Sequence, residues 1–168
     1  MRNAGPGVVD RAGLVALAVD AALGGDTDTV ARAIAAGVPV NTTGPRGDSL
    51  LMLAACYGNA GTVKALLDSG ADANQPDGEG QSPLGGVAFK GLIGVAELLV
   101  GGGAIIDAAS ADGRTPLMMA AAFNRADMVA WLLKQGACRD ARDANGQRAI
   151  DVARATGASD VVALLTHV

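Results

Sequence analysis

The sequence contains few aromatic residues and a single histidine. One Trp, one Tyr and two Phe are the only aromatic residues among 168, although half of all residues are hydrophobic. A core must therefore consist of Ala, Val, Leu and Met, a composition that favours closely packed helices over sheets. The only histidine, His167, is the penultimate residue, where a chain is expected to fray. A histidine-based catalytic triad, an HExxH motif and a multi-histidine zinc site are excluded by this count, and we expect no metal ion or other cofactor.

Cysteine is equally scarce, with Cys56 and Cys138 far apart in the chain and no CxxC motif. This spacing does not indicate a disulfide framework, so a reducing compartment, the cytoplasm, is expected. Cys56 has no neighbouring histidine that would activate its thiol. We predict that it is a packing or surface residue rather than a nucleophile.

Long hydrophobic runs and an excess of positive charge are also lacking. The uncharged segment 12–19 is too short to span a membrane, and Asp20 interrupts the stretch that most resembles an export signal. The net charge is −4 and the pI is about 4.8, so there is no broad basic surface to hold phosphate backbones. We expect neither a membrane nor a nucleic acid among the partners.

What the sequence does contain is a repeat with a period of 33 residues. Glycine returns at this interval in four places, and three further columns of polar or aliphatic residues keep the interval without an insertion. Such a period indicates a repeat architecture, in which neighbouring units bury one continuous core. The columns are Gly37/Gly70/Gly103/Gly136, Asn41/Asn74/Asp107/Asp140, Leu51/Leu84/Leu117/Ile150 and Leu66/Leu99/Leu132/Leu165.

Within one unit the pattern predicts two short helices and a loop. In residues 112–140, the pair Thr115-Pro116 is typical of a helix start, with Thr as the N-cap and Pro at the first helical position. A second helix begins near Ala126 and is expected to stop at Gly136. The loop over residues 137–146 carries Asp, Asn and Gly, which favour turns.

Three segments share a further motif: "GDSLLMLAA" from Gly47, "GQSPLGGVA" from Gly80 and "GRTPLMMAA" from Gly113. Together with the unit endings "VKALLDSGADAN" and "MVAWLLKQGACRD", they resemble the motifs of ankyrin-repeat proteins. The resemblance implies an all-α repeat solenoid of about five helix-turn-helix units with hairpin-like loops. It would form a single domain over residues 1–168, with units at 8–41 (N-terminal cap), 42–74, 75–107, 108–140 and 141–168 (C-terminal cap).

The family's usual histidine after the Pro-Leu pair is absent, and the four corresponding positions carry other residues. We expect the stack to depend more on apolar contacts, because the hydrogen bonds of that histidine between units are missing. The replacing residues are Met52, Gly85, Met118 and Asp151.

Residues 77–91, "DGEGQSPLGGVAFKG", are rich in glycine and could suggest the phosphate-binding loop of a nucleotide enzyme. In the repeat register, however, Gly80 belongs to a hairpin and Lys90 follows a helix, whereas the lysine of a phosphate-binding loop begins one. A nucleotide site is therefore rejected. Gly85 and Gly86 lie inside a predicted helix, where each should cost about 1 kcal/mol relative to Ala, and the sequence offers no reason for them.

The resemblance also implies where a partner binds. In ankyrin repeats the partner usually lies on the concave side, formed by the loop tips before the first helices and by the exposed ends of those helices. Carried over to this sequence, the tips provide Arg46, Asp48, Glu79, Gln81, Asp112, Arg114, Asn145 and Gln147, and the helix ends provide Cys56, Tyr57, Phe89, Lys90, Ala122 and Phe123.

Three of the four aromatic residues fall on this expected surface. Tyr57, Phe89 and Phe123 should line up across neighbouring units at a spacing of about 8–10 Å, and aromatic residues are frequent interface anchors. The alternative is that they merely cap the core between units. Trp131, in a second helix, is expected to pack in the core or on the convex face. The mixed charges at the tips are typical of a polar rim suited to another protein.

We therefore expect a non-catalytic, cytoplasmic and monomeric module that binds, inhibits or scaffolds a partner protein. An alternative function stays open, that of a protective accessory protein, because small stand-alone bacterial ankyrins resemble toxin-immunity proteins or companions of redox enzymes such as catalase. The composition, rich in Ala, Gly and Arg and poor in Lys, fits a bacterial source.

Overall fold

The computed structural model describes residues 10–167. This range folds into ten α-helices, and its one β-type pairing is an isolated antiparallel bridge between Thr43 and Ser49. The predicted all-α repeat solenoid is confirmed, while residues 8 and 9 of the first predicted unit, and Val168 of the last, lie outside the described residues. The helices are α1 (Arg11–Gly24), α2 (Thr27–Ala35), α3 (Leu50–Cys56), α4 (Ala60–Asp68), α5 (Pro83–Lys90), α6 (Ile93–Gly101), α7 (Pro116–Ala122), α8 (Ala126–Lys134), α9 (Ala149–Thr156) and α10 (Ser159–His167).

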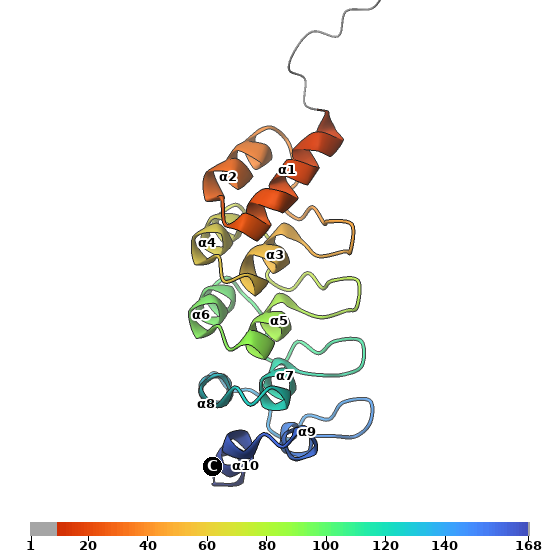
Figure 1. Cartoon of the computed structure of the whole chain (residues 1–168), viewed down its shortest axis with the longest axis vertical. Helices are drawn as coiled ribbons and strands as arrows, with labels where there is room; N and C mark the ends of the chain where they lie inside the picture. Colours follow the sequence, from red (N-terminus) through yellow and green to blue (C-terminus); the bar gives the residue numbers. More distant parts are fainter. Residues whose placement is uncertain (1–9, 168) are drawn as a thin grey trace, which may run out of the picture.

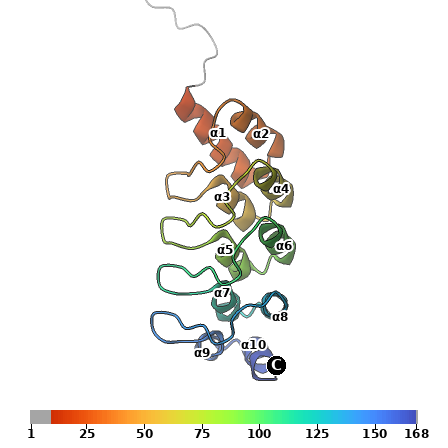
Figure 2. The same ribbon diagram turned by 180° about the vertical axis from the view of Figure 1, so that it is seen from behind.

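The helices form two rows, with hairpin-like loops along one side (Figure 1). Each odd-numbered helix packs against the even-numbered helix that follows it, and successive odd-numbered helices pack against one another through the whole stack. We call the odd-numbered helices the inner row and the even-numbered helices the outer row. The loops before α3, α5, α7 and α9 project from the inner row, and the view from behind shows the same order (Figure 2). The elements therefore stack as a solenoid, in which each unit contacts mainly its neighbours.

Three inner helices begin at the hydroxyl residue that the repeat pattern indicates. Each hydroxyl accepts a hydrogen bond from the backbone N–H three residues later, and so satisfies a donor that has no partner inside the helix. The accepting and donating residues are Ser49 and Met52, Ser82 and Gly85, and Thr115 and Met118.

The last inner helix, α9, begins differently, at Arg148. The carboxylate of Asp151 accepts hydrogen bonds from the backbone N–H and from the guanidinium Nε of Arg148, both at 3.1 Å. The guanidinium hydrogen bond is the main cause that lowers the pKa of Asp151. A charged pair thus caps the terminal unit, in place of the hydroxyl that caps the others.

Polar side chains link successive units even though the family's histidine is absent. The repeat column at positions 41, 74 and 107 supplies an oxygen that accepts a backbone N–H from the next unit each time. Polar contacts between units therefore come from this column rather than from the position of the family's histidine. They join Asn41 to Asp72 at 2.8 Å, Asn74 to Ile105 at 2.8 Å and Asp107 to Cys138 at 3.1 Å.

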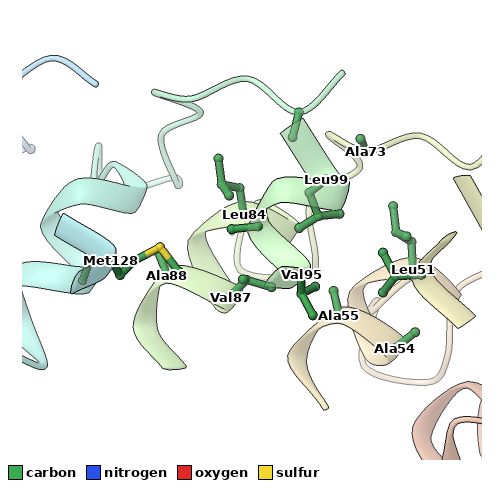
Figure 3. Packing of buried hydrophobic residues seen from close by; sticks show 14 of the residues in the cluster. Leu51, Ala54, Ala55, Ala73, Leu84, Val87, Ala88, Val95, Leu99 and Met128 are labelled. Atoms are coloured by element: carbon green, nitrogen blue, oxygen red, sulfur yellow. The ribbon is translucent and has the colours of Figure 1, made fainter. Parts of the chain in front are cut away.

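Two columns of leucine form the centre of the core. Leu51, Leu84 and Leu117 of the inner row are at most 1% exposed, and Leu66, Leu99 and Leu132 of the outer row are fully buried. Alanines such as Ala54, Ala55 and Ala88 belong to the same cluster, and their small side chains allow the helices to approach closely (Figure 3). Trp131 is half-buried and packs against this cluster, as predicted.

The structure explains Gly86, one of the two helical glycines that the sequence leaves without a reason. A Cβ atom at Gly86 would lie 2.7 Å from Cys56 Sγ and 3.6 Å from Met52 Sδ. At Gly85 a Cβ would lie 3.3 Å from Gln81 Cγ, a tighter approach than most Cβ atoms make. The sulfur of Cys56 therefore occupies the space that a side chain at position 86 would need.

Replacing Gly86 with Ala is expected to lower the free energy of unfolding by about 1–2 kcal/mol, because the overpacking against Cys56 outweighs the gain in helix propensity. Gly94 in α6 is the matched control, since it is exposed and a Cβ there meets nothing within 4 Å. Gly94→Ala should raise the free energy of unfolding by about 0.5–1 kcal/mol. Urea unfolding followed by circular dichroism measures both free energies. Stabilisation of similar size at both sites would show that the Cys56 side chain moves aside without strain.

Candidate functional site

The hairpin tips and the C-terminal ends of α3, α5, α7 and α9 lie along the inner row, and we call this surface the inner face. The geometry of its tips comes from local hydrogen bonds. Asp77 Oδ1 accepts the backbone N–H groups of Glu79 and Gln81, each at 2.9 Å. Asp143 Oδ1 accepts those of Asn145 and Gln147 in the same way, also at 2.9 Å. Each of these tips is thus held in shape by an aspartate that precedes it, which the sequence prediction did not identify.

Charged side chains at the other two tips form local ion pairs. Arg46 lies 3.3 Å from Asp48, and Arg114 lies 3.2 Å from Asp112. A hydrogen bond from the Ser110 hydroxyl to Asp112 is the main cause that lowers the pKa of the Asp112 carboxyl. Both tips therefore present one positive and one negative side chain that pair with each other.

The structure brings four of the predicted tip residues together around one shallow pocket. The pocket has a volume of about 250 Å³ and lies between the second and third hairpins. Met119 of α7 lines it, a residue that sequence reasoning missed. The sequence could have indicated Met119, because it stands four residues before Phe123 and this spacing places both side chains on one face of the helix. The lining residues are Glu79, Gln81, Ser110, Ala111, Asp112, Arg114 and Met119. Arg46 and Asp48, on the first hairpin, and Asn145 and Gln147, on the last, lie outside it.

The helix-end residues form a second group. The rings of Phe89 and Phe123 meet edge to face with centroids 4.4 Å apart, and Lys90 Nζ lies 4.9 Å from the centroid of the Tyr57 ring. Tyr57 is 60% exposed and Phe123 is 47% exposed, whereas Phe89 is half-buried. We call these four residues the aromatic cluster.

The predicted spacing of about 8–10 Å is wrong for Phe89 and Phe123. In the repeat register Phe89 corresponds to Cys56 and Ala122, one position earlier than Tyr57 and Phe123. Its ring therefore leaves the helix in a different direction and contacts Phe123 directly. Because Lys90 takes the register position of Tyr57, the result is two contacting pairs linked by the adjacent residues Phe89 and Lys90, rather than an evenly spaced row.

A hydrogen bond to the backbone at the end of α5 also supports this cluster. The Nε of Arg125, which precedes α8, donates a hydrogen bond to the backbone carbonyl of Phe89 at 3.0 Å. It thereby connects the end of α5 to the start of α8, the outer helix of the following unit. No sequence pattern indicates this role of Arg125, because the two residues come from different units.

No arrangement for metal chemistry is found among residues 10–167, where no group of three His, Cys, Asp or Glu could hold a metal ion. Burial raises the pKa of the Cys56 thiol to about 11, so the thiol stays protonated at neutral pH. Its sulfur packs 3.6 Å from Met52 Sδ. This environment agrees with the prediction of a packing residue, because a nucleophilic cysteine needs its thiolate stabilised.

Within the described residues, no helix is both long and apolar enough to cross a membrane.

Comparison with known families agrees with this geometry. A family model described as ankyrin repeats, in three copies, matches residues 17–110 and 86–168. The chain belongs to the ankyrin-repeat family. Ankyrin repeats are generally protein–protein interaction modules and the family is typically non-enzymatic. A search of curated proteins found no match. In this ankyrin-repeat chain, the inner face is formed by the loop tips and first-helix ends to which the resemblance assigned partner binding.

Proposed function

We propose that this ankyrin-repeat chain binds, inhibits or scaffolds a partner protein through its inner face, with the aromatic cluster as the anchor. The observation that carries the proposal is that three of the four aromatic residues in the chain gather at the ends of three adjacent inner helices. Two of them, Tyr57 and Phe123, are about half exposed or more. Partly exposed aromatic rings contribute a large contact area at a small entropic cost, which is why they are frequent anchors.

Two contacts within the cluster hold its side chains in place for binding. The edge-to-face contact holds Phe123 against Phe89, and the ammonium group of Lys90 lies over the ring of Tyr57. Both contacts restrict rotation before a partner arrives, so less conformational entropy is lost on association. Lys90 is exposed and adds a positive charge that a carboxylate of the partner can approach.

The tips add a polar rim beside this anchor. The pocket that contains Met119 lies between the second and third tips, so an inserted side chain of the partner can contact Met119 while the polar groups of Glu79, Gln81 and Arg114 surround it. An apolar centre surrounded by polar groups is the usual anatomy of an interface between proteins. The inner face thus supports binding to a protein.

The test is affinity capture from an extract of the source cell with three forms of the chain. The first is the wild type, the second is the triple variant Tyr57→Ala, Phe89→Ala, Phe123→Ala, and the third is the control Ile105→Ala. Ile105 is 59% exposed and lies in the loop after α6, away from the cluster. We expect the triple variant to weaken the Kd of a captured partner at least ~10-fold, and the control to leave it unchanged.

Circular dichroism and thermal unfolding establish that the triple variant is folded. If the folded triple variant captures every partner of the wild type with equal affinity, the aromatic cluster is not the anchor and the proposed surface is wrong.

A further inference from the structure

A groove on the described part of the chain lies away from the inner-face aromatics, at the N-terminal end of the stack. It has a volume of about 680 Å³ and lies between α1 and the first hairpin, whose residues Thr43, Gly44 and Pro45 form its other wall. The two walls meet where Val19 approaches Gly44. The residues that α1 contributes are Arg11, Ala12, Val15, Ala16, Val19 and Asp20. Four of these six are small and apolar.

The groove results from the way the stack begins. Each later hairpin packs closely on its predecessor, as the approach of Gly47 to Gly78 and of Gly113 to Asp143 and Ala144 shows. Within residues 10–167 no hairpin precedes the first one, and the N-terminal half of α1 leans over it instead (Figure 1). The α1 helix alone covers less of the first hairpin than a preceding hairpin would. Part of the apolar surface between α1 and the first hairpin therefore stays open.

The lining of this groove has an internal symmetry. If a second α1 runs antiparallel with its centre between positions 15 and 16, the six lining positions pair only with one another. Arg11 then faces Asp20 of the other helix, Ala12 faces Val19, and Val15 faces Ala16. Each larger aliphatic side chain meets an alanine, which is the condition for two helices to interlock closely.

Charge complementarity supports the same pairing. Arg11 and Asp20 are both exposed, and neither has an ion-pair partner among the residues that the structure describes. They are nine residues apart, about 13.5 Å along the helix axis. In an antiparallel pair both ends of the interface therefore carry an opposite-charge contact, whereas a parallel pair would set Arg11 against Arg11 and Asp20 against Asp20.

We propose that this groove binds α1 of a second copy of the chain, giving a two-fold symmetric antiparallel dimer. A two-fold axis requires one self-complementary surface, and the lining of the groove provides it. The dimer replaces the sequence-based expectation of a monomer and does not depend on the proposed function, because the aromatic cluster lies on α3, α5 and α7. One helix and one loop from each copy form a small interface, so we expect a weak dimer with a Kd on the order of 10–100 µM.

The test is sedimentation equilibrium of the full chain between about 5 µM and 1 mM. The mass should rise with concentration from 16.5 kDa towards twice that value. Arg11→Asp places like charges at both ends of the interface, and so does Asp20→Arg. Each single variant should raise the dissociation constant about 10-fold or more. Arg32→Asp on α2 changes the net charge as Arg11→Asp does but lies outside the groove, and it should leave the dimer unchanged.

Two further samples test whether the dimer depends on the pairing of these two charges. An equimolar mixture of the Arg11→Asp and Asp20→Arg chains should form a heterodimer, because every end contact is again between opposite charges. The double variant Arg11→Asp, Asp20→Arg should dimerise as the wild type does. A chain that stays monomeric at 1 mM overturns the proposal. A dimer that is insensitive to both single reversals overturns it as well.

Discussion

Replacing Gly47 with Ala is expected to lower the free energy of unfolding by about 3 kcal/mol. Gly47 has a φ of +86°, so any L side chain there is strained. A Cβ atom would also lie 2.9 Å from the backbone nitrogen of Gly78 and 3.2 Å from its Cα. Those atoms belong to the next hairpin and cannot rotate away as a side chain can. The substitution therefore strains its own turn and pushes two hairpins apart.

Gly146 offers a matched control, because it occupies the same hairpin position in the last unit. Its φ is +75°, and a Cβ there meets nothing within 4 Å. Gly146→Ala should cost only the conformational strain, about 1 kcal/mol. Urea unfolding of both variants separates the two effects. Equal losses at the two positions would mean that the hairpins move apart freely, contrary to the close packing described above.

Replacing Leu117 with Ala is expected to lower the free energy of unfolding by about 3–4 kcal/mol. Leu117 is fully buried in α7, and this helix packs against both α5 and α9. The truncation removes apolar contacts and leaves a cavity at a place where three inner helices meet. No aromatic side chain belongs to the buried core of the described residues, so only smaller aliphatic and thioether groups are near enough to move into the space.

The control for this variant is Ile105→Ala, which also shortens an aliphatic side chain but at a position that is 59% exposed. It should change the free energy of unfolding by about 0.5 kcal/mol or less. Chemical denaturation with intrinsic Trp131 fluorescence and circular dichroism reports on both. A decrease in the free energy of unfolding below about 1 kcal/mol for Leu117→Ala would show that neighbouring helices move in and fill the cavity.

A single strict period allowed the fold to be predicted from the sequence. The start of α7 at Pro116 after the N-cap Thr115 follows from the local chemistry of these two residues, which does not depend on distant contacts. The burial of the leucine columns follows from helical periodicity in the same way. Trp131 was placed correctly because its neighbours in α8 define which side of the helix is apolar.

The candidate site was predicted less completely. The register located the tips and the helix ends, but the contact between Phe89 and Phe123 depends on the direction in which each side chain leaves its helix. The hydrogen bond from Arg125 to the carbonyl of Phe89 joins residues that are 36 positions apart. No pattern within a unit can reveal such a contact, since it exists only after the units have stacked.

The sequence by itself determined the repeat, the helical class and the family, because a 33-residue period and local capping chemistry leave few alternatives. It also indicated which side chains the loop tips and helix ends present. Only the tertiary structure decided the reason for Gly86, the shape of the aromatic cluster and the groove beside α1. These features depend on how neighbouring units approach one another, and the distances between units are set by packing across the stack rather than by any one segment.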